Sequence, residues 1–443
     1  MTENNGTYQR IERLKKEISS DQIRASARLK GDECAWTRDR QMPLPDMIRC
    51  TMAKKGKTPV IELDDYFEDA GRMEQMVSKQ DYLQQRKKLN PEVFRQLNQS
   101  YLRDFYCGQE VKCWNGYIVL AIDGSAAEVP NSAENRKEYG VSENGNGGVA
   151  RANCSVMYDV FNKFMLDIVI DSYPGNEIGE AKTLISSLRE IIGSRPVLII
   201  FDRGYVSLEF QDYLDALGIK YLIRLKSDAF KAEVNGMVSE DEEIFLEYTK
   251  NRLYNVKQRS LERWRDLSQR RGSTIRMVRT SFQDEKQGIL ITNFREACMK
   301  DIRWLYRKRW MIEEQYNTMK NKMKFESVTG NASIYVKQDF FAQTLVSNII
   351  QDLIIRAEYQ AVSKPRKKPL CHPIRINHNV AIGQFKKQFI RLMLEEDEAC
   401  KTAMFWELIA KMERNILPIR ELKSSPRKFN NANKTQCNLK DSI

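Results

Sequence analysis

The sequence predicts an α/β fold: a mixed sheet flanked by helices, with a helical N-terminal domain and a β-rich insertion. Two continuous apolar runs, YIVLAI at 117–122 and VLIIF at 197–201, have the length of fully buried strands. A third segment, 306–323, carries apolar residues at helical spacing. A chain of 443 residues is long enough for two or three domains with a substantial core.

The composition favours a nucleic-acid partner. The chain carries 72 basic and 60 acidic residues, a formal net charge of +12, and such a surface attracts phosphate backbones. Nine cysteines without any C-x-x-C pair fit a reducing compartment better than a disulfide framework. The two histidines, His372 and His378, lack the second cysteine pair that a zinc site needs. No apolar run approaches the ~20 residues of a membrane span and no signal sequence opens the chain, so we expect a cytoplasmic protein without a membrane partner.

We expect residues 1–106 to form a helical domain that binds DNA. Ser78 is a suitable N-cap for a helix that starts near Lys79. That helix carries Arg86, Lys87 and Lys88, which are suitable contacts for a DNA backbone. An ordinary basic helix on the surface is the alternative.

Each of the two apolar runs leads into an aspartate that a glycine closely follows. The first run continues as Asp123-Gly124, and the second as Asp202 with Gly204 two residues later. Because glycine lets a chain turn sharply, we expect both aspartates at the carboxyl ends of central strands. Open α/β sheets place their ligands in the crevice outside those ends. A simple turn at either position is the alternative.

The segment YRKRWMIEEQYNTMK at 306–320 places an acid among several cations on one helical stripe. At about 100° per residue, Tyr306, Arg309, Glu313 and Lys320 fall within an arc of roughly 60°. A carboxylate flanked by cations suggests phosphate chemistry. The alternative is a solvated surface helix with charge pairs one turn apart.

Taken together, Asp123, Asp202 and Glu313 resemble the D-D-E triad of transposases built on an RNase H-like core. The spacing of Tyr, two residues, Arg, three residues, Glu, six residues, Lys is similar to the signature of the family named after insertion sequence four. The surrounding motifs AIDGS, FDRGY, YLIRLK and LITN agree with that family. The resemblance extends from about residue 35 to about residue 355 and implies an RNase H-like catalytic core.

The resemblance also implies a role for each residue of the motif. Asp123, Asp202 and Glu313 would hold two Mg²⁺ ions, for which Mn²⁺ can substitute, with Asp123 bridging both. Two divalent ions can serve both ends of a phosphodiester displacement, and hard cations prefer oxygen ligands. The DNA-binding residues would be Tyr306, Arg309, Trp310 and Lys320, which hold phosphates or, in the case of Trp310, stack on an extruded base. A tryptophan packed in the core is the alternative for Trp310.

The order of motifs divides the chain. The gap between the second aspartate and the glutamate is long enough for an insertion with short β-prone segments, and the polar, basic end of the chain reads as disordered. Asn176, Glu177 and Glu180 resemble an Asn-Glu element common in the family, although acids at a helix start are the simpler interpretation. We expect a core at 107–226 and 294–360, an insertion at 227–293, a helical region at 361–421 and a disordered basic tail at 422–443.

The sequence therefore predicts a DDE transposase, a metal-dependent enzyme that moves an insertion sequence by cut-and-paste transposition. Its partners would be double-stranded DNA, both terminal inverted repeats and target, and a second copy of the chain in a homodimeric synaptic complex. We expect it in the prokaryotic cytoplasm, associated with the nucleoid. The alternatives are a catalytically idle repressor that binds terminal repeats and a domesticated RNase H-like nuclease.

Overall fold

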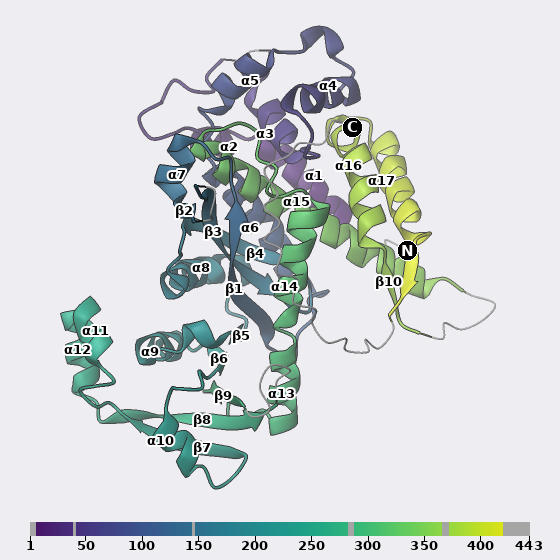
Figure 1. The fold of residues 1–443 in the computed structure, drawn as a ribbon. Helices are drawn as coiled ribbons and strands as arrows, with labels where there is room; N and C mark the ends of the chain where they lie inside the picture. Colours follow the sequence, from purple (N-terminus) through teal and green to yellow (C-terminus); the bar gives the residue numbers. More distant parts are fainter. Residues whose placement is uncertain (1–5, 39–40, 144–146, 282–287, 366–371, 420–443) are drawn as a thin grey trace.

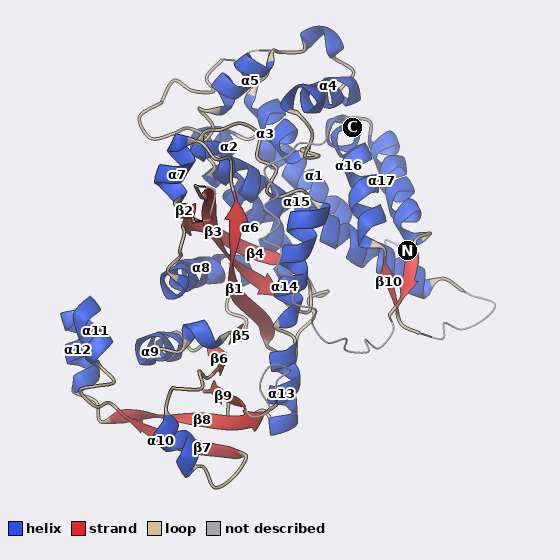
Figure 2. Ribbon diagram, in the orientation of Figure 1, coloured by secondary structure: helices blue, strands red, loops and turns tan. Residues whose placement is uncertain are grey.

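The computed structural model describes residues 6–38, 41–143, 147–281, 288–365 and 372–419. This part of the chain is a mixed α/β fold in which helices cover a central sheet (Figure 1 and Figure 2). The expected class, a mixed sheet flanked by helices, is therefore present. Among the described helices, none is long and apolar enough to cross a membrane. The tail at 422–443 and the basic residues 366–368 lie outside the described residues.

Nine strands form the main sheet. Their bounds are β1 Ile118–Glu128, β2 Val141–Ser142, β3 Val149–Asp159, β4 Met165–Ser172, β5 Val197–Phe201, β6 Lys220–Arg224, β7 Asp241–Glu247, β8 Gly272–Thr280 and β9 Gly288–Thr292. The order across the sheet is β2-β3-β1-β5-β6-β9-β8-β7, and β4 also pairs with β3. β1, β5 and β6 are parallel, whereas β3 and β4 are antiparallel to their neighbours.

Both faces of β1 are buried, as its continuous apolar run predicts. Val119 and Ala121 belong to one hydrophobic cluster, and Ile118, Leu120 and Ile122 to a second. Such alternation between two buried faces is the period-2 pattern of a central strand. The second cluster contains residues of α6 (Glu92–Tyr106), α8 (Glu177–Ile192) and α9 (Leu208–Ala216). The first cluster contains most of the buried apolar residues of α15 (Ser333–Ser363).

β1 does not end at Asp123, which corrects the expected position of this residue. The strand continues to Glu128 because the long neighbour β3 keeps pairing with it, from Leu120 opposite Asp159 to Glu128 opposite Arg151. Only the parallel pairing with β5 stops earlier, at Ala121. Asp123 thus lies just beyond the last residue of β1 that pairs with β5, but within the stretch of β1 that pairs with β3.

The expected single helix at 306–320 is broken into three pieces. They are α13 (Met299–Arg307), α14 (Trp310–Asn317) and a π-helical turn, η3 (Thr318–Lys322). Between α13 and α14 the backbone bonds tighten: the amide of Lys308 donates to Leu305 and that of Arg309 to Tyr306, three residues back. Such 3₁₀-type bonds change the pitch of the chain. The segment 306–320 is therefore not one regular helix.

The N-terminal helices pack on α15 through buried ion pairs. Their bounds are α1 Gly6–Ile18, α2 Asp21–Ser26, α3 Leu44–Met52, α4 Pro59–Asp69 and α5 Lys79–Arg86, with a 3₁₀ turn η1 at Met73–Gln75. Asp339 of α15 accepts hydrogen bonds from Arg86 and, at 2.9 Å, from Lys54. Arg86, expected among the bases of a DNA-binding helix, is 0 % exposed and so holds the fold together instead.

The segment 227–293 extends the main sheet. The β-prone stretches expected there lie in β7, β8 and β9, and β9 pairs antiparallel with β6 of the central strands. Three short helices accompany them: α10 Lys231–Gly236, α11 Tyr254–Arg259 and α12 Leu261–Ser268. In Figure 1 these elements occupy the end of the molecule opposite the N-terminal helices.

The last described elements cover α15. α16 (His378–Leu394) and α17 (Glu398–Glu413) pack against it and against each other. A two-stranded sheet of β10 (Ile374–Ile376) and β11 (Ile416–Pro418) lies beside them. α15 itself is 31 residues long.

Candidate active site

Two neighbouring parallel strands bring Asp123 and Asp202 together. β1 and β5 pair as far as Ala121 opposite Ile200. Asp123 lies two residues beyond that pair, and Asp202 follows Phe201, the last residue of β5. Both aspartates are thus at the edge where the parallel pairing ends, which is where α/β sheets bind ligands.

Arg309 joins Asp123 to Glu313. Its Nη1 lies 3.0 Å from Oδ2 of Asp123, and its Nη2 lies 2.7 Å from Oε1 of Glu313. One planar guanidinium can make both contacts because its donors are arranged as a rigid fork. The third predicted acid therefore comes to the same edge of the sheet as the first.

Tyr306 makes the corresponding link to Asp202. Its hydroxyl points to Oδ1 of Asp202 at 3.4 Å, which is longer than a typical O–H···O hydrogen bond. Burial raises the pKa of Tyr306, and the charge of Asp202 raises it further. The tyrosine is therefore a hydrogen-bond donor to the acid and not an anion.

Lys320 and Tyr316 hold the backbone of β1 around Asp123. Lys320 Nζ lies 2.9 Å from Oγ of Ser125 and 2.6 Å from the carbonyl oxygen of Ala126. The hydroxyl of Tyr316 donates to the carbonyl oxygen of Asp123 at 2.8 Å. In this structure Lys320 therefore contacts the strand two and three residues beyond Asp123, and its Nζ also lies 3.7 Å from Oε1 of Glu326.

Trp310 is on the surface at the start of α14. It is 45 % exposed, which rules out the alternative of a tryptophan packed in the core. Its indole ring is thus partly accessible to solvent at the start of α14.

Electrostatic crowding is strongest at Asp123. Burial raises the pKa of its carboxyl group to about 6, and although Arg309 opposes this rise, the charges of Asp202 and Glu313 add to it. A carboxylate near two others favours either a proton or a cation. The acids therefore carry more negative charge than Arg309 alone neutralises.

The carboxylates at this sheet edge are oxygen donors, the ligand type that hard divalent cations prefer. In the described ranges, no three His, Cys, Asp or Glu side chains are grouped closely enough to hold a metal ion as they stand. A cation, the guanidinium of Arg309, nevertheless lies between the carboxylates of Asp123 and Glu313. Carboxylate oxygens in excess over cations are the ligands that Mg²⁺ prefers.

A second group of polar side chains near the acids was not assigned from the sequence. Glu180 and Tyr205 are both buried, and the charges of Asp123 and Asp202 contribute to raising the pKa of Tyr205 after burial itself. In the sequence, the motif FDRGY indicates no separate role for Tyr205. Glu177 and Glu180 are indicated by their likeness to the family's Asn-Glu element, and their spacing places both on one side of a helix start.

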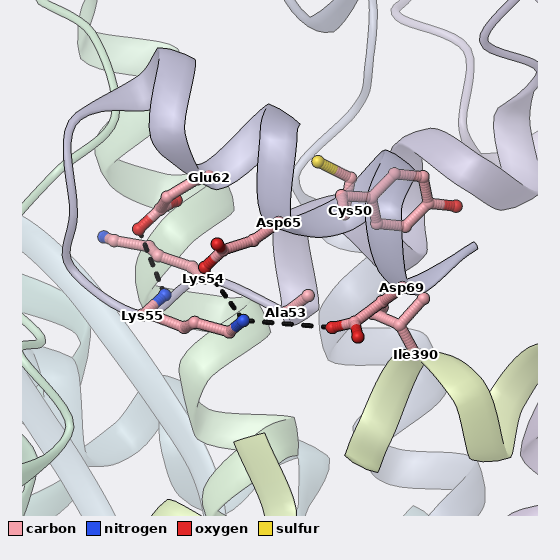
Figure 3. A pocket seen from close by; sticks show the side chains of 9 residues that line it. Cys50, Ala53, Lys54, Lys55, Glu62, Asp65, Asp69 and Ile390 are labelled. Carbon is pink, nitrogen blue, oxygen red and sulfur yellow. Dashed lines mark hydrogen bonds and ion pairs between the residues drawn. The ribbon is translucent and has the colours of Figure 1, made fainter. Parts of the chain in front are cut away.

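A small pocket among the N-terminal helices is not part of this site (Figure 3). Its volume is about 10 Å³, the space of a single water molecule. Its polar groups pair with each other: Lys55 Nζ lies 2.9 Å from Asp65 and 3.9 Å from Asp69. Glu62 accepts the amide hydrogen of Lys55 at 3.0 Å. The pocket is therefore a structural feature of α3, α4 and α16.

Comparison with known proteins gives a family. Curated protein sequences gave no match. Among solved structures, the chain is similar to a cryo-EM structure of the piggyBac transposase synaptic complex with hairpin DNA, at 11 % sequence identity and a TM-score of 0.46. That match covers 94 % of this chain and 87 % of the other. The family model described as "Transposase DDE domain" matches residues 114–349, which include all seven predicted site residues. Because this match spans more than half of the 443 residues, the chain belongs to the DDE transposase family.

Proposed function

We propose that this chain is an active transposase of the insertion-sequence-four type, with an RNase H-like core, that excises an insertion sequence at its terminal inverted repeats and joins it to target DNA. One observation carries the proposal. Acids from two strands and one helix converge at one sheet edge, where Arg309 contacts Asp123 and Glu313 and Tyr306 contacts Asp202. A surface charge pair would not require that convergence.

Asp123, Asp202 and Glu313 are the proposed catalytic residues and would hold Mg²⁺, as two ions, with Mn²⁺ as a substitute. When bound, the metal supplies activation of a water or a DNA 3′-hydroxyl and offsets charge on the leaving oxygen. The chain itself contributes the positions of the three carboxylates. The fold anchors them from three sides, because β1 and β5 carry the aspartates and α14 carries the glutamate.

The proposed DNA contacts surround the acids. Arg309 can exchange one of its carboxylate partners for a phosphate oxygen, since its fork fits both. Tyr306 lies beside Asp202, and Lys320 lies beside Ser125 of β1. Trp310 offers an exposed indole face, and stacking of a base on such a ring is worth about 1–3 kcal/mol.

The larger assembly follows from the resemblance. We propose a homodimer that synapses two element ends, with the helices of 1–106 and the segment 227–293 contributing to DNA binding. Lys79 and Lys87 line a groove of about 590 Å³ that residues of 130–134 and 328–335 also line, with Glu134 among them. Lysines along a groove support a backbone contact, because each neutralised phosphate releases counterions.

The first experiment compares cleavage and joining of labelled DNA by the native chain and by Glu313→Gln. The substrate is a duplex made from the sequences that flank the coding region, with Mg²⁺ present, and binding is measured in parallel. We expect the native chain to cut and join, and the variant to bind without cutting. Glu314→Gln is the matched control, because Glu314 is the adjacent residue and is exposed.

Each other outcome identifies a different function. Cleavage without joined product indicates a nuclease derived from the same core. Binding by both chains without cleavage indicates an idle repressor of transposition. Equal cleavage by Glu313→Gln contradicts the assignment of Glu313.

A further inference from the structure

The first turn of α8 lies against the strand that aligns Asp123. Glu180, which is 2 % exposed, accepts hydrogen bonds from Ser155 and, at 2.7 Å, from Asn153, both on β3. Ser155 is the direct cross-strand neighbour of Gly124, the residue after Asp123. A Cβ atom at Gly124 would lie 3.3 Å from Oγ of Ser155. The carboxylate of Glu180 therefore fixes the side chain on which the backbone beside Asp123 rests.

The same turn of α8 contacts the segment that carries Asp202. The carboxylate of Glu177 lies so close to Gly204 that a Cβ atom there would be 2.3 Å from Oε2 of Glu177. Gly204 is two residues beyond Asp202, in the 3₁₀ turn η2 (Arg203–Tyr205). Glu177 and Glu180 are three residues apart, so one helical turn spans the two aspartate-bearing segments.

A glycine also makes room on the other side of Glu180. A Cβ atom at Gly175 would lie 2.0 Å from Nδ2 of Asn153 and 2.4 Å from Oε1 of Glu180. That Oε1 atom is buried and has no hydrogen-bond partner among the described residues. A buried carboxylate oxygen without a donor is costly, so its position calls for a reason other than stability.

The hydroxyl of Tyr205 is a second buried polar atom without a partner among the described residues. The residue closes η2 and is 1 % exposed. Its polar surroundings are carboxylates, whose charges add to burial in raising its pKa: Asp123, Glu177, Glu180 and Asp202. A phenol in that position can only donate toward acids, directly or through a buried water.

We propose that Glu180 and Tyr205 are positioning residues that set the spacing and orientation of Asp123 and Asp202 from behind the sheet edge. The inference rests on the proposed function, because it assumes that the two aspartates hold a divalent ion. Glu180 acts on Asp123 through Ser155, and the hydroxyl of Tyr205 acts on the aspartates by donating toward their carboxylates, directly or through a buried water. Groups that orient metal ligands typically contribute about 10–100-fold to metal affinity or activity.

The test measures Mn²⁺ binding to the full-length chain by electron paramagnetic resonance, alongside DNA cleavage and thermal unfolding. The variants are Glu180→Gln, which keeps the size but removes the charge, and Tyr205→Phe, which removes only the hydroxyl. We expect Mn²⁺ affinity that depends on Asp123 to fall by about 10-fold or more in each. Cleavage should recover as the Mn²⁺ concentration rises. The melting temperature of Tyr205→Phe should be unchanged or higher, because its hydroxyl has no partner.

Matched controls separate positioning from a general effect of losing a buried group. Tyr221→Phe removes another buried tyrosine hydroxyl without a partner among the described residues, on β6 and away from the aspartates. Glu190→Gln changes an exposed glutamate on the same helix as Glu180. Both should bind Mn²⁺ like the native chain.

The outcomes distinguish this inference from the proposed function. Native Mn²⁺ affinity in Glu180→Gln and Tyr205→Phe overturns the inference, as does a loss that Tyr221→Phe shares. If the native chain binds Mn²⁺ through Asp123 but cuts no DNA, the proposed function fails, and the variants still decide the inference. If Asp123→Asn binds Mn²⁺ as well as the native chain does, the assumption about the aspartates fails and the inference fails with it.

Discussion

Two groups of charged side chains use the same residue types in opposite proportions. Where the N-terminal helices pack on α15, a single carboxylate, that of Asp339, pairs with two cations, Lys54 and Arg86. All three side chains are buried. At the sheet edge, one guanidinium, that of Arg309, faces three carboxylates, and that group is partly open to solvent. In the first group the acid is fully paired and the excess charge is positive, whereas the second group carries an excess of negative charge.

The difference shows how ion pairs that stabilise the fold can be told from acids that can bind a ligand. A buried acid with enough cations has no capacity left for a ligand, because every oxygen already accepts a bond. An acid in a group that is short of cations still attracts a proton or a metal ion. An excess of acids over cations, and not burial alone, distinguishes the candidate site from the buried ion pairs.

The largest expected effect on the free energy of unfolding is at Asp339, which pairs with Lys54 and Arg86. Asp339→Asn leaves two buried cations without their acid, and breaking such a pair costs about 3–5 kcal/mol of unfolding free energy. Urea unfolding would measure the loss. The control is Arg391→Gln, which removes an exposed cation that pairs with Asp69 at 3.0 Å and should cost ~1 kcal/mol or less. A loss no larger than that of the control would mean that the buried cations find another partner.

A smaller effect on the free energy of unfolding, of opposite sign, is expected at Asp123 in the group around Arg309. Asp123→Asn should abolish cleavage and, in metal-free buffer at neutral pH, raise the unfolding free energy by on the order of 1–3 kcal/mol. The reason is that ionising Asp123 in the folded chain is unfavourable, since burial raises its pKa to about 6. Removing the charge removes that cost.

The pH dependence of the same variant supplies the measurement. Between about pH 4 and pH 6 the folded chain keeps a proton on Asp123 that the unfolded chain releases, so native stability should fall as pH rises through this window. Asp123→Asn should lack that part of the fall. Asp171→Asn, at an exposed position of β4, should retain it. Parallel curves for the native chain and Asp123→Asn would contradict the raised pKa.

The smallest expected effect on stability is at Trp310, which belongs to neither group. Trp310→Ala should change the unfolding free energy by ~0.5 kcal/mol or less, because the side chain is exposed. If the indole stacks on a base, the same change should weaken binding to element-end DNA by about 1–3 kcal/mol, measured by fluorescence anisotropy. Tyr359→Ala, an exposed aromatic on α15, should leave DNA binding unchanged. Equal affinities for native and Trp310→Ala chains would exclude stacking.

Local patterns predicted part of this arrangement. The buried strands at 117–122 and 197–201 follow from their apolar runs, and the spacing of 306, 309 and 313 placed three side chains on one side of the chain. The structure brings these residues next to Asp123 and Asp202. Whether they catalyse a reaction stays a prediction that the experiments above address.

The remaining features depend on partners distant in sequence. The extension of β1 past Asp123 requires β3, and the burial of Arg86 requires Asp339. The breaks on both sides of α14 fit no propensity signal in YRKRWMIEEQYNTMK, since none of its residues is glycine or proline. Glu180 and Tyr205 gave weak signals for the same reason, because their significance arises only where α8 meets β3 and η2.

The ion pair between Arg86 and Asp339 also has a consequence for the order of events during synthesis. The two residues are 253 positions apart in the chain. At a translation rate of about 5–20 residues per second, Arg86 would leave the ribosome roughly 10–50 s before its acid exists. During that interval the N-terminal helices carry cations that have no partner in α15. The nascent chain therefore completes its N-terminal region late, only after the catalytic sheet and α15 have been made.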